Sequence, residues 1–90
     1  MEVAYPGHRY LLHHTDSKED SGHSTVLQFV MRPPHHHPCE GVTNQEVLRA
    51  LIDRVKVLDA ELPWEGNSKI LHHLRMALVL HEARALDLLY

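Results

Sequence analysis

The sequence of 90 residues contains one cysteine, Cys39, which excludes a disulfide bond within the chain. It contains no apolar run of about 20 residues, the length that a membrane-spanning helix requires. Residues 1–10 lack the charged and then apolar order of a secretory leader, so we expect a cytosolic protein. Aromatic residues make up only 6% of this short chain. Because so short a chain buries only a modest share of its surface, we expect one small structural domain that needs a metal or partner subunits for its stability.

Positive charge is also scarce, because nine Lys and Arg residues stand against twelve Asp and Glu residues. The net charge of −3 with neutral histidine excludes a general basic surface for DNA or RNA. Ten histidines are present, and their full protonation would reverse the sign of the net charge. We expect the electrostatics of any partner contact to depend on pH between about 5 and 7.

The N-terminal part, residues 1–40, predicts strands and a connector. Residues 8–13 and 24–31 are rich in aromatic and branched side chains, and the polar residues 15–22 lie between them. This pattern predicts a two-stranded antiparallel ribbon, which needs a further packing surface because two strands are barely stable alone. Residues 32–41 contain Pro33, Pro34 and Pro38 and predict an irregular connector.

The C-terminal part, residues 41–90, predicts a helical hairpin. Residues 43–46 have the spacing of a capping box, and Pro63 marks the end of the first helix. Asn67 or Ser68 is the expected cap of a second helix that runs to about Leu89. The inter-helix stripe expected on the first helix consists of Val47, Leu48, Leu51, Ile52, Val55, Leu58 and Leu62.

The second helix is apolar on two sides. The face expected to meet the first helix consists of Ile70, Leu71, Leu74, Ala77, Leu78, His81, Ala85 and Leu88. A second apolar surface consists of Met76, Val79, Leu80, Ala83 and Leu86. Because so short a chain can hardly cover both sides, this surface predicts a subunit interface. The alternative is that the N-terminal strands cover it.

Metal binding and catalysis have weak sequence signals. His35, His36 and His37, with Cys39 nearby, lie in a proline-rich segment without the spacing of a rigid metal site. His72 and His73 point about 100° apart on a helix, and His81 is expected to pack within the apolar face. No nucleophile–base motif is recognisable, so we expect no enzyme activity, no metal and no cofactor.

The turn between the helices instead contains side chains that are suited to binding a ligand. Trp64 stands just before a helix N-terminus, where free amides attract phosphate and an indole can stack on a base. Lys69, His72 and His73 are within reach of this turn, and Arg75 and Arg84 flank the apolar faces of the second helix. Each of these residues also has a simpler interpretation, as a plug of the hairpin end or as a charge at its rim.

The hairpin resembles a family of phage proteins. Its sequence is similar to that of the phage Thoeris anti-defence (Tad) signal sponges. The similarity lies in residues 41–54, in Leu62-Pro63 and Asn67, and in Leu74, Ala77-Leu78, Arg84 and Asp87. Their helical hairpin is shared with an anti-CBASS sponge. The resemblance covers residues 41–87, and residues 8–10 and 29–32 fit the strands with which members often begin.

This resemblance implies a function. Members of the family are non-catalytic proteins that assemble, typically as hexamers, in the cytoplasm of the infected host, where they sequester cyclic nucleotide immune signals. Their ligands are cyclic ADP-ribose isomers and, for some members, cyclic di- or trinucleotides. The family's turn aromatic falls on Leu62, for which Trp64 is expected to substitute, and one late arginine falls on Leu88. The expected ligand-binding residues are Arg32, Leu62, Trp64, Asn67, Lys69, His72, Arg75 and Arg84.

Together these patterns predict an oligomeric α+β protein, with a two-stranded antiparallel ribbon followed by an antiparallel two-helix hairpin. Its expected partners are a cyclic nucleotide and further copies of the chain, with no nucleic-acid polymer and no membrane. Two alternatives remain open. One is a helical interaction module whose second apolar face binds a host protein, and the other is a histidine-rich metal-binding protein.

Overall fold

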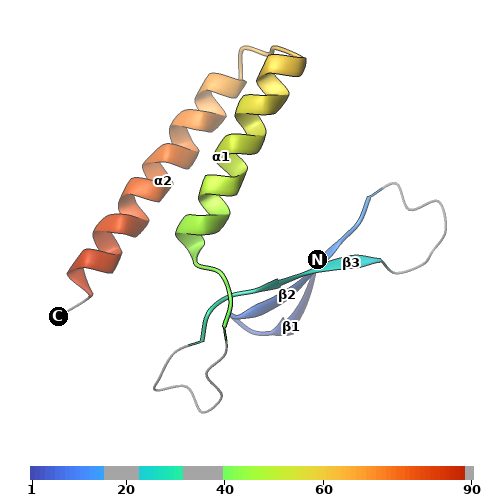
Figure 1. Ribbon diagram of the computed structural model, residues 1–90, viewed down its shortest axis with the longest axis vertical. Helices are drawn as coiled ribbons and strands as arrows, with labels where there is room; N and C mark the ends of the chain where they lie inside the picture. The colour runs from blue at the N-terminus through green and yellow to red at the C-terminus, as the bar shows by residue number, and fades with distance from the viewer. Residues whose placement is uncertain (16–22, 32–39, 89–90) are drawn as a thin grey trace. The chain divides into compact units, whose positions relative to one another are not determined.

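The computed structural model describes residues 1–15, 23–31 and 40–88 of the chain. The chain divides into two compact units, Met1–Thr43 and Asn44–Tyr90. The first unit contains the strands β1 (Glu2–Tyr5), β2 (Arg9–His13) and β3 (Ser24–Gln28), and the second contains the helices α1 (Asn44–Glu61) and α2 (Asn67–Asp87) (Figure 1). Strands followed by two helices confirm the predicted α+β class.

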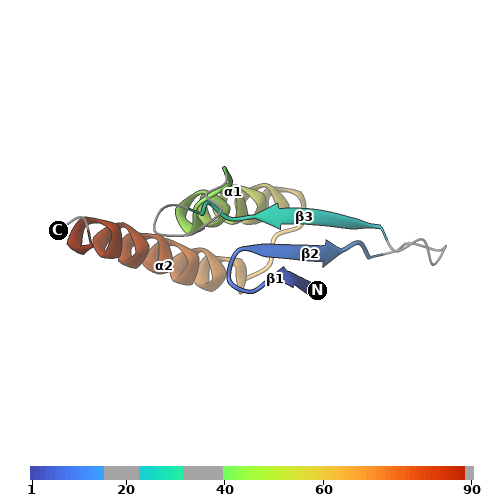
Figure 2. The ribbon, with the colours of Figure 1, turned by 90° about the horizontal axis from the view of Figure 1, so that it is seen from below.

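The sheet has three antiparallel strands in the order β1-β2-β3, so the prediction of a two-stranded ribbon is wrong by one strand (Figure 2). The missed signal is a Pro6-Gly7 turn that joins β1 to β2. His8 donates its backbone N–H to the Tyr5 carbonyl at 3.0 Å, and Gly7 has a φ of 80°. A positive φ at this position is what a type II turn with proline before glycine requires. The additional strand supplies part of the packing surface that a two-stranded ribbon lacks.

Strand β3 ends at Gln28, three residues before the predicted end at Met31. Its partner β2 begins at Arg9, which pairs with Gln28, so the ladder ends there, and Phe29 instead forms an isolated parallel bridge with Val42. Val42 donates its backbone N–H to Gln28 and accepts from Val30, at 2.9 and 3.0 Å. Gly41 permits this close approach, since a Cβ at this position would lie 2.5 Å from the Gln28 carbonyl oxygen.

The hydrophobic core of the described residues is very small. Met31, with 6% of its surface exposed, is the one buried hydrophobic residue among them. Tyr10 and Phe29 contact edge to face with 6.0 Å between ring centroids. Val3 and Val26 remain more than half exposed. A chain with so little burial gains little stability from its own interior.

The two helices lie side by side and antiparallel (Figures 1 and 2). Helix α1 begins at Asn44, directly after Thr43 of the predicted capping box, and ends at Glu61 before Pro63. The predicted cap of α2 is wrong by one residue or two, because Gly66 is the N-cap and makes no side-chain capping hydrogen bond. The side chain of Asn67 instead donates a hydrogen bond to Asp59 of α1.

The helix–helix seam is narrower than predicted, and neither helix contains a fully buried residue. Leu51, Leu58 and Leu62, expected in the seam, are 42%, 41% and 78% exposed. Leu62 lies beyond the last residue of α1. Ile70 and Ala85 of α2, and Leu88 directly after it, were also expected in the seam and are exposed. The half-buried residues of the seam are Val47, Leu48, Ile52, Val55, Leu71, Leu74, Ala77, Leu78 and His81.

Polar contacts hold the open end of the hairpin. Arg49 contacts Glu46 at 3.4 Å on the same helix and Glu82 at 3.1 Å on α2. Gln45 donates its side-chain amide to the backbone carbonyl of His81 at 3.5 Å. Because these groups are largely exposed, each ion pair contributes only about 0–1 kcal/mol.

The second apolar surface of α2 is present and exposed. Met76, Val79, Leu80 and Leu86 expose 47%, 56%, 65% and 66% of their surface, and Ala83 is also exposed. Within the described hairpin, α1 covers the opposite side of α2. Neither helix is long and apolar enough to cross a membrane, within the part of the chain that the structure describes.

Candidate ligand pocket at the helical turn

Asp59, near the end of α1, organises the turn between the helices. One oxygen of its carboxylate accepts the backbone N–H of Trp64 at 3.3 Å and the side-chain amide of Asn67 at 2.7 Å. The backbone N–H of Asn67 in turn donates to the Trp64 carbonyl at 3.0 Å. A single carboxylate therefore fixes both Trp64 in the turn and Asn67, the first residue of α2.

The indole of Trp64 lies directly over Gly66. A Cβ added to Gly66 would fall 2.2–2.6 Å from three ring carbons, so only glycine leaves room for the ring in this position. The side chain nevertheless remains 61% exposed. The indole is thus held against the backbone and still presents much of its aromatic surface to solvent, as base stacking requires.

A pocket with a volume of about 460 Å³ lies beside this indole. It is lined by Trp64, Glu65, Gly66, Lys69, Ile70 and His73. Its volume lies within the range of about 300–1,000 Å³ that is common for small-molecule sites. The ammonium group of Lys69 and the imidazole of His73 supply hydrogen-bond donors for an anion, Ile70 supplies apolar contact, and Glu65 adds a carboxylate.

The structure brings together only part of the predicted site. Trp64 and Lys69 line the pocket as expected. Asn67 is engaged with Asp59, so its predicted role in ligand contact becomes a structural role. His73 lines the pocket in place of His72, and their two rings contact with 5.5 Å between centroids. Leu62 is 78% exposed and does not line the pocket.

The predicted arginines lie away from the turn. At about 1.5 Å per residue, Arg75 and Arg84 stand about 12 and 25 Å along α2 from its first residue, Asn67. Arg84 therefore cannot reach the pocket of its own chain. Arg32, at the end of the N-terminal part, lies outside the described residues.

Three lining residues were missed by sequence reasoning. Glu65, Gly66 and Ile70 had no assigned ligand role, although Gly66 directly follows the tryptophan turn. Asp59 also had no role assigned from the sequence. Its spacing to Trp64 and Asn67, within reach across a tight turn, was the available signal.

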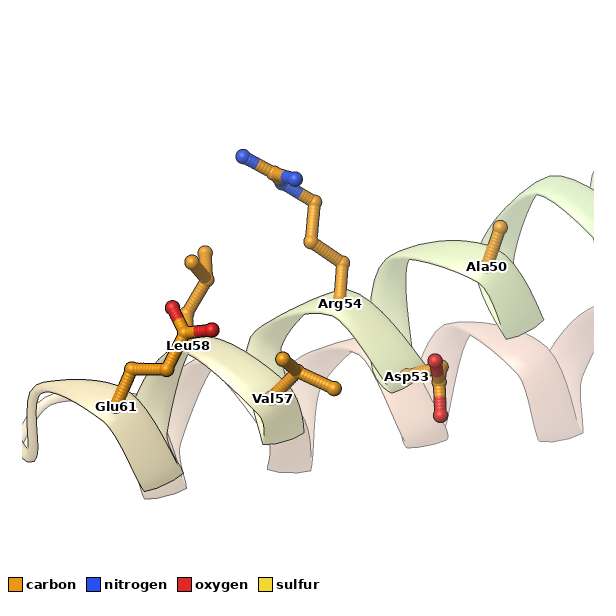
Figure 3. A pocket seen from close by; sticks show the side chains of 6 residues that line it. All are labelled: Ala50, Asp53, Arg54, Val57, Leu58 and Glu61. Atoms are coloured by element: carbon orange, nitrogen blue, oxygen red, sulfur yellow. The ribbon is translucent and has the colours of Figure 1, made fainter.

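A second pocket, of about 360 Å³, lies on α1 and is lined by Ala50, Asp53, Arg54, Val57, Leu58 and Glu61. Figure 3 shows these side chains along one stretch of the helix, with Arg54 extending away from the ribbon. Two carboxylates and one guanidinium make it net acidic, and it contains no aromatic ring. It is therefore a poorer site for an anionic nucleotide than the turn pocket.

Histidines do not form a metal centre in the described chain. Among residues 1–15, 23–31 and 40–88, no three His, Cys, Asp or Glu side chains are placed to hold a metal ion. His35, His36, His37 and Cys39, the candidates of the metal hypothesis, lie outside the described residues. His13 and His14 contact Ser24 and Thr25 hydroxyls across the sheet at 3.1 and 2.8 Å.

Comparison of the chain with family models, with curated proteins and with solved structures finds no match.

Proposed function

We propose that this chain is a non-enzymatic sponge that binds cyclic nucleotide immune signals and sequesters them without cleavage. Its ligands would be cyclic ADP-ribose isomers, cyclic di- or trinucleotides, or both. It would act as a homo-oligomer, with a hexamer as the expected state, in the cytoplasm of a phage-infected bacterium. The observation that carries the proposal is the turn pocket, which combines an exposed, backbone-supported indole with the ammonium group of Lys69.

The side chains of the pocket suit a nucleotide in two ways. Stacking of a base on an aromatic ring contributes about 1–3 kcal/mol and accepts any base. Lys69 lies in the first turn of α2, where the positive end of the helix dipole also favours a phosphate group. The ligand class itself comes from the resemblance of residues 41–87 to the phage signal sponges.

Self-association follows from the affinity that sequestration requires. A sponge that competes with a nanomolar sensor needs a binding free energy of about −12 kcal/mol. Six residues around one exposed turn can hardly supply this. Arg84, about 25 Å along α2, can contribute to a pocket only from another copy of the chain. We therefore propose that pockets are completed between copies.

The proposal is tested by calorimetric titration of the protein with a panel of cyclic ADP-ribose isomers and cyclic di- and trinucleotides. Trp64 is the single tryptophan, so its fluorescence reports occupancy of the pocket. Trp64→Ala is expected to weaken binding about 10- to 100-fold, the loss of one stacking contact. Lys69→Ala should also weaken binding, whereas Lys56→Ala, at an exposed site on α1, should not.

Recovery of the ligand by mass spectrometry after incubation should show an unchanged molecule. If no member of the panel binds, or if Trp64→Ala and Lys69→Ala both retain the affinity of the unmodified chain, the proposed function is wrong.

A second candidate function is a helical interaction module that binds a host protein. The exposed apolar surface of α2, with Leu80 and Leu86 about two-thirds exposed, favours it. This function predicts no calorimetric response to nucleotides and a homo-oligomer of low order or none.

A further inference from the structure

The outer surface of α2 has a regular spacing. His72, Met76, Val79, Ala83 and Leu86 follow each other at alternating intervals of four and three residues. All five are exposed, and they form what we term the outer seam. Alternating intervals of three and four are the signature of a helix that packs along its length against another helix. The regularity indicates a helical partner of similar length rather than an irregular surface.

We propose that the occupant of the outer seam is α2 of a second copy of this chain, running antiparallel. This inference rests on the proposed self-association and names the contact that would produce it. Two seams related by a two-fold axis would place Met76 opposite Val79 of the second copy, and His72 opposite Ala83 of the second copy. The small side chain of Ala83 leaves room for the imidazole of His72.

Charges beside the seam favour the antiparallel direction. Arg75 and Glu82 flank it on one side, one heptad apart, and both are exposed. In the antiparallel register Arg75 of each copy faces Glu82 of the other, so the opposite charges pair twice. In a parallel pair Glu82 would instead face Asp87 of the second copy, which brings like charges together.

Glu82 already contacts Arg49 of its own chain at 3.1 Å through one carboxylate oxygen, Oε1. A carboxylate accepts several hydrogen bonds, so Arg75 of the second copy would add a contact on this acid without displacing Arg49. The antiparallel register also lays the half of α2 that carries Arg84 along the half of the second copy that carries Lys69 and His73.

Disulfide cross-linking distinguishes the two directions. Two variants are prepared with Cys39→Ser as background, one with His72→Cys and one with Ala83→Cys. Within one helix these positions are about 16 Å apart, so they cannot bond within a chain. After mixing and mild oxidation, the antiparallel seam predicts a mixed dimer as the main product, with little linkage of either variant to itself. The pair Lys56→Cys and Ala83→Cys is the control and should give only random linkage.

Light scattering provides an independent readout. Val79→Glu introduces a charge at the centre of the outer seam and is expected to lower the mass to half that of the unmodified assembly or less, because a two-fold seam joins the copies in pairs. Ala60→Glu introduces the same charge on the exposed side of α1 and should leave the mass unchanged.

Efficient linkage of each variant to itself would overturn the antiparallel seam while leaving self-association intact. An unmodified chain that is monomeric at micromolar concentration would overturn the seam and the proposed assembly, and the nucleotide titration would still decide on ligand binding. An oligomer that Val79→Glu does not alter would place the interface elsewhere and overturn the inference.

Discussion

Replacement of Asp59 by alanine is expected to destabilise the helical hairpin. The substitution removes two hydrogen bonds to an ionised acceptor, one from the Asn67 amide at 2.7 Å and one from the Trp64 backbone at 3.3 Å. A hydrogen bond to a charged group contributes about 1.5–3 kcal/mol. The longer of the two contributes less, and Asp59 is only half-buried, so about 3 kcal/mol is a reasonable sum before opposing effects.

Two effects oppose this loss. Alanine has a higher helix propensity than aspartate, by about 0.5 kcal/mol. A carboxylate in the last turn of α1 also interacts unfavourably with the negative end of the helix dipole, by about 0.3–1 kcal/mol. The expected net loss in the free energy of unfolding for Asp59→Ala is therefore about 1.5–2 kcal/mol.

Urea denaturation followed by circular dichroism at 222 nm measures this loss, because the hairpin contains all the helices described. Asp53→Ala, at an exposed position of the same helix, is the matched control, since it gains the same helix propensity without the turn contacts. It should be as stable as the unmodified chain or slightly more stable. If Asp59→Ala were as stable as Asp53→Ala, the carboxylate would not be what organises the turn.

Two glycine substitutions test the close contacts in the fold. Gly66→Ala should displace the indole of Trp64, because the new Cβ would lie 2.2 Å from the ring, and at a φ of −70° it adds no backbone strain. A changed tryptophan emission and at least a 10-fold weaker nucleotide affinity are the expected results, and an unchanged emission would contradict the position of the ring. Gly41→Ala would place a Cβ 2.5 Å from the Gln28 carbonyl oxygen and should cost about 1–3 kcal/mol. Thermal unfolding followed by near-ultraviolet circular dichroism measures that cost, and an unaltered melting temperature would show that the backbone can separate freely there.

The helices could be predicted from the sequence better than the sheet. The capping box at residues 43–46 and Pro63 place the ends of α1 within two residues, because both signals act through local backbone chemistry. Strand β1 was missed although the Pro6-Gly7 turn that creates it is local, because a four-residue strand has too short a pattern to distinguish it from a loop. The early end of β3 was missed for the same reason, since β3 stops where its partner β2 begins at Arg9, directly after that turn.

The candidate site, like the fold, could be predicted only where it depends on residues close in sequence. Trp64 and Lys69 were predicted to lie together because they are close in sequence across one turn, and the structure confirms that both line the pocket. Asn67 was predicted to contact ligand, but Asp59 competes for its side chain from the other helix. The choice between His72 and His73 depends on the rotation of α2 relative to the turn, which a wheel based on residue spacing does not determine.

Sparse burial connects the two proposals. Neither helix contains a buried residue, while Val79, Leu80 and Leu86 expose more than half of their surface. Burial of apolar surface contributes about 25 cal/mol per Å², so covering this face in an assembly would add stability that the single chain lacks. The turn pocket is also incomplete, because the described residues that line it include one indole, one lysine and one histidine but no arginine and no tyrosine or phenylalanine. An antiparallel contact along α2 would bury the exposed apolar side chains of the outer seam. The same contact would bring Arg84 of one copy toward the turn pocket of the neighbouring copy. Assembly and nucleotide affinity should therefore fall together when the seam is disrupted, whereas substitutions within the pocket should weaken affinity and leave the assembly intact.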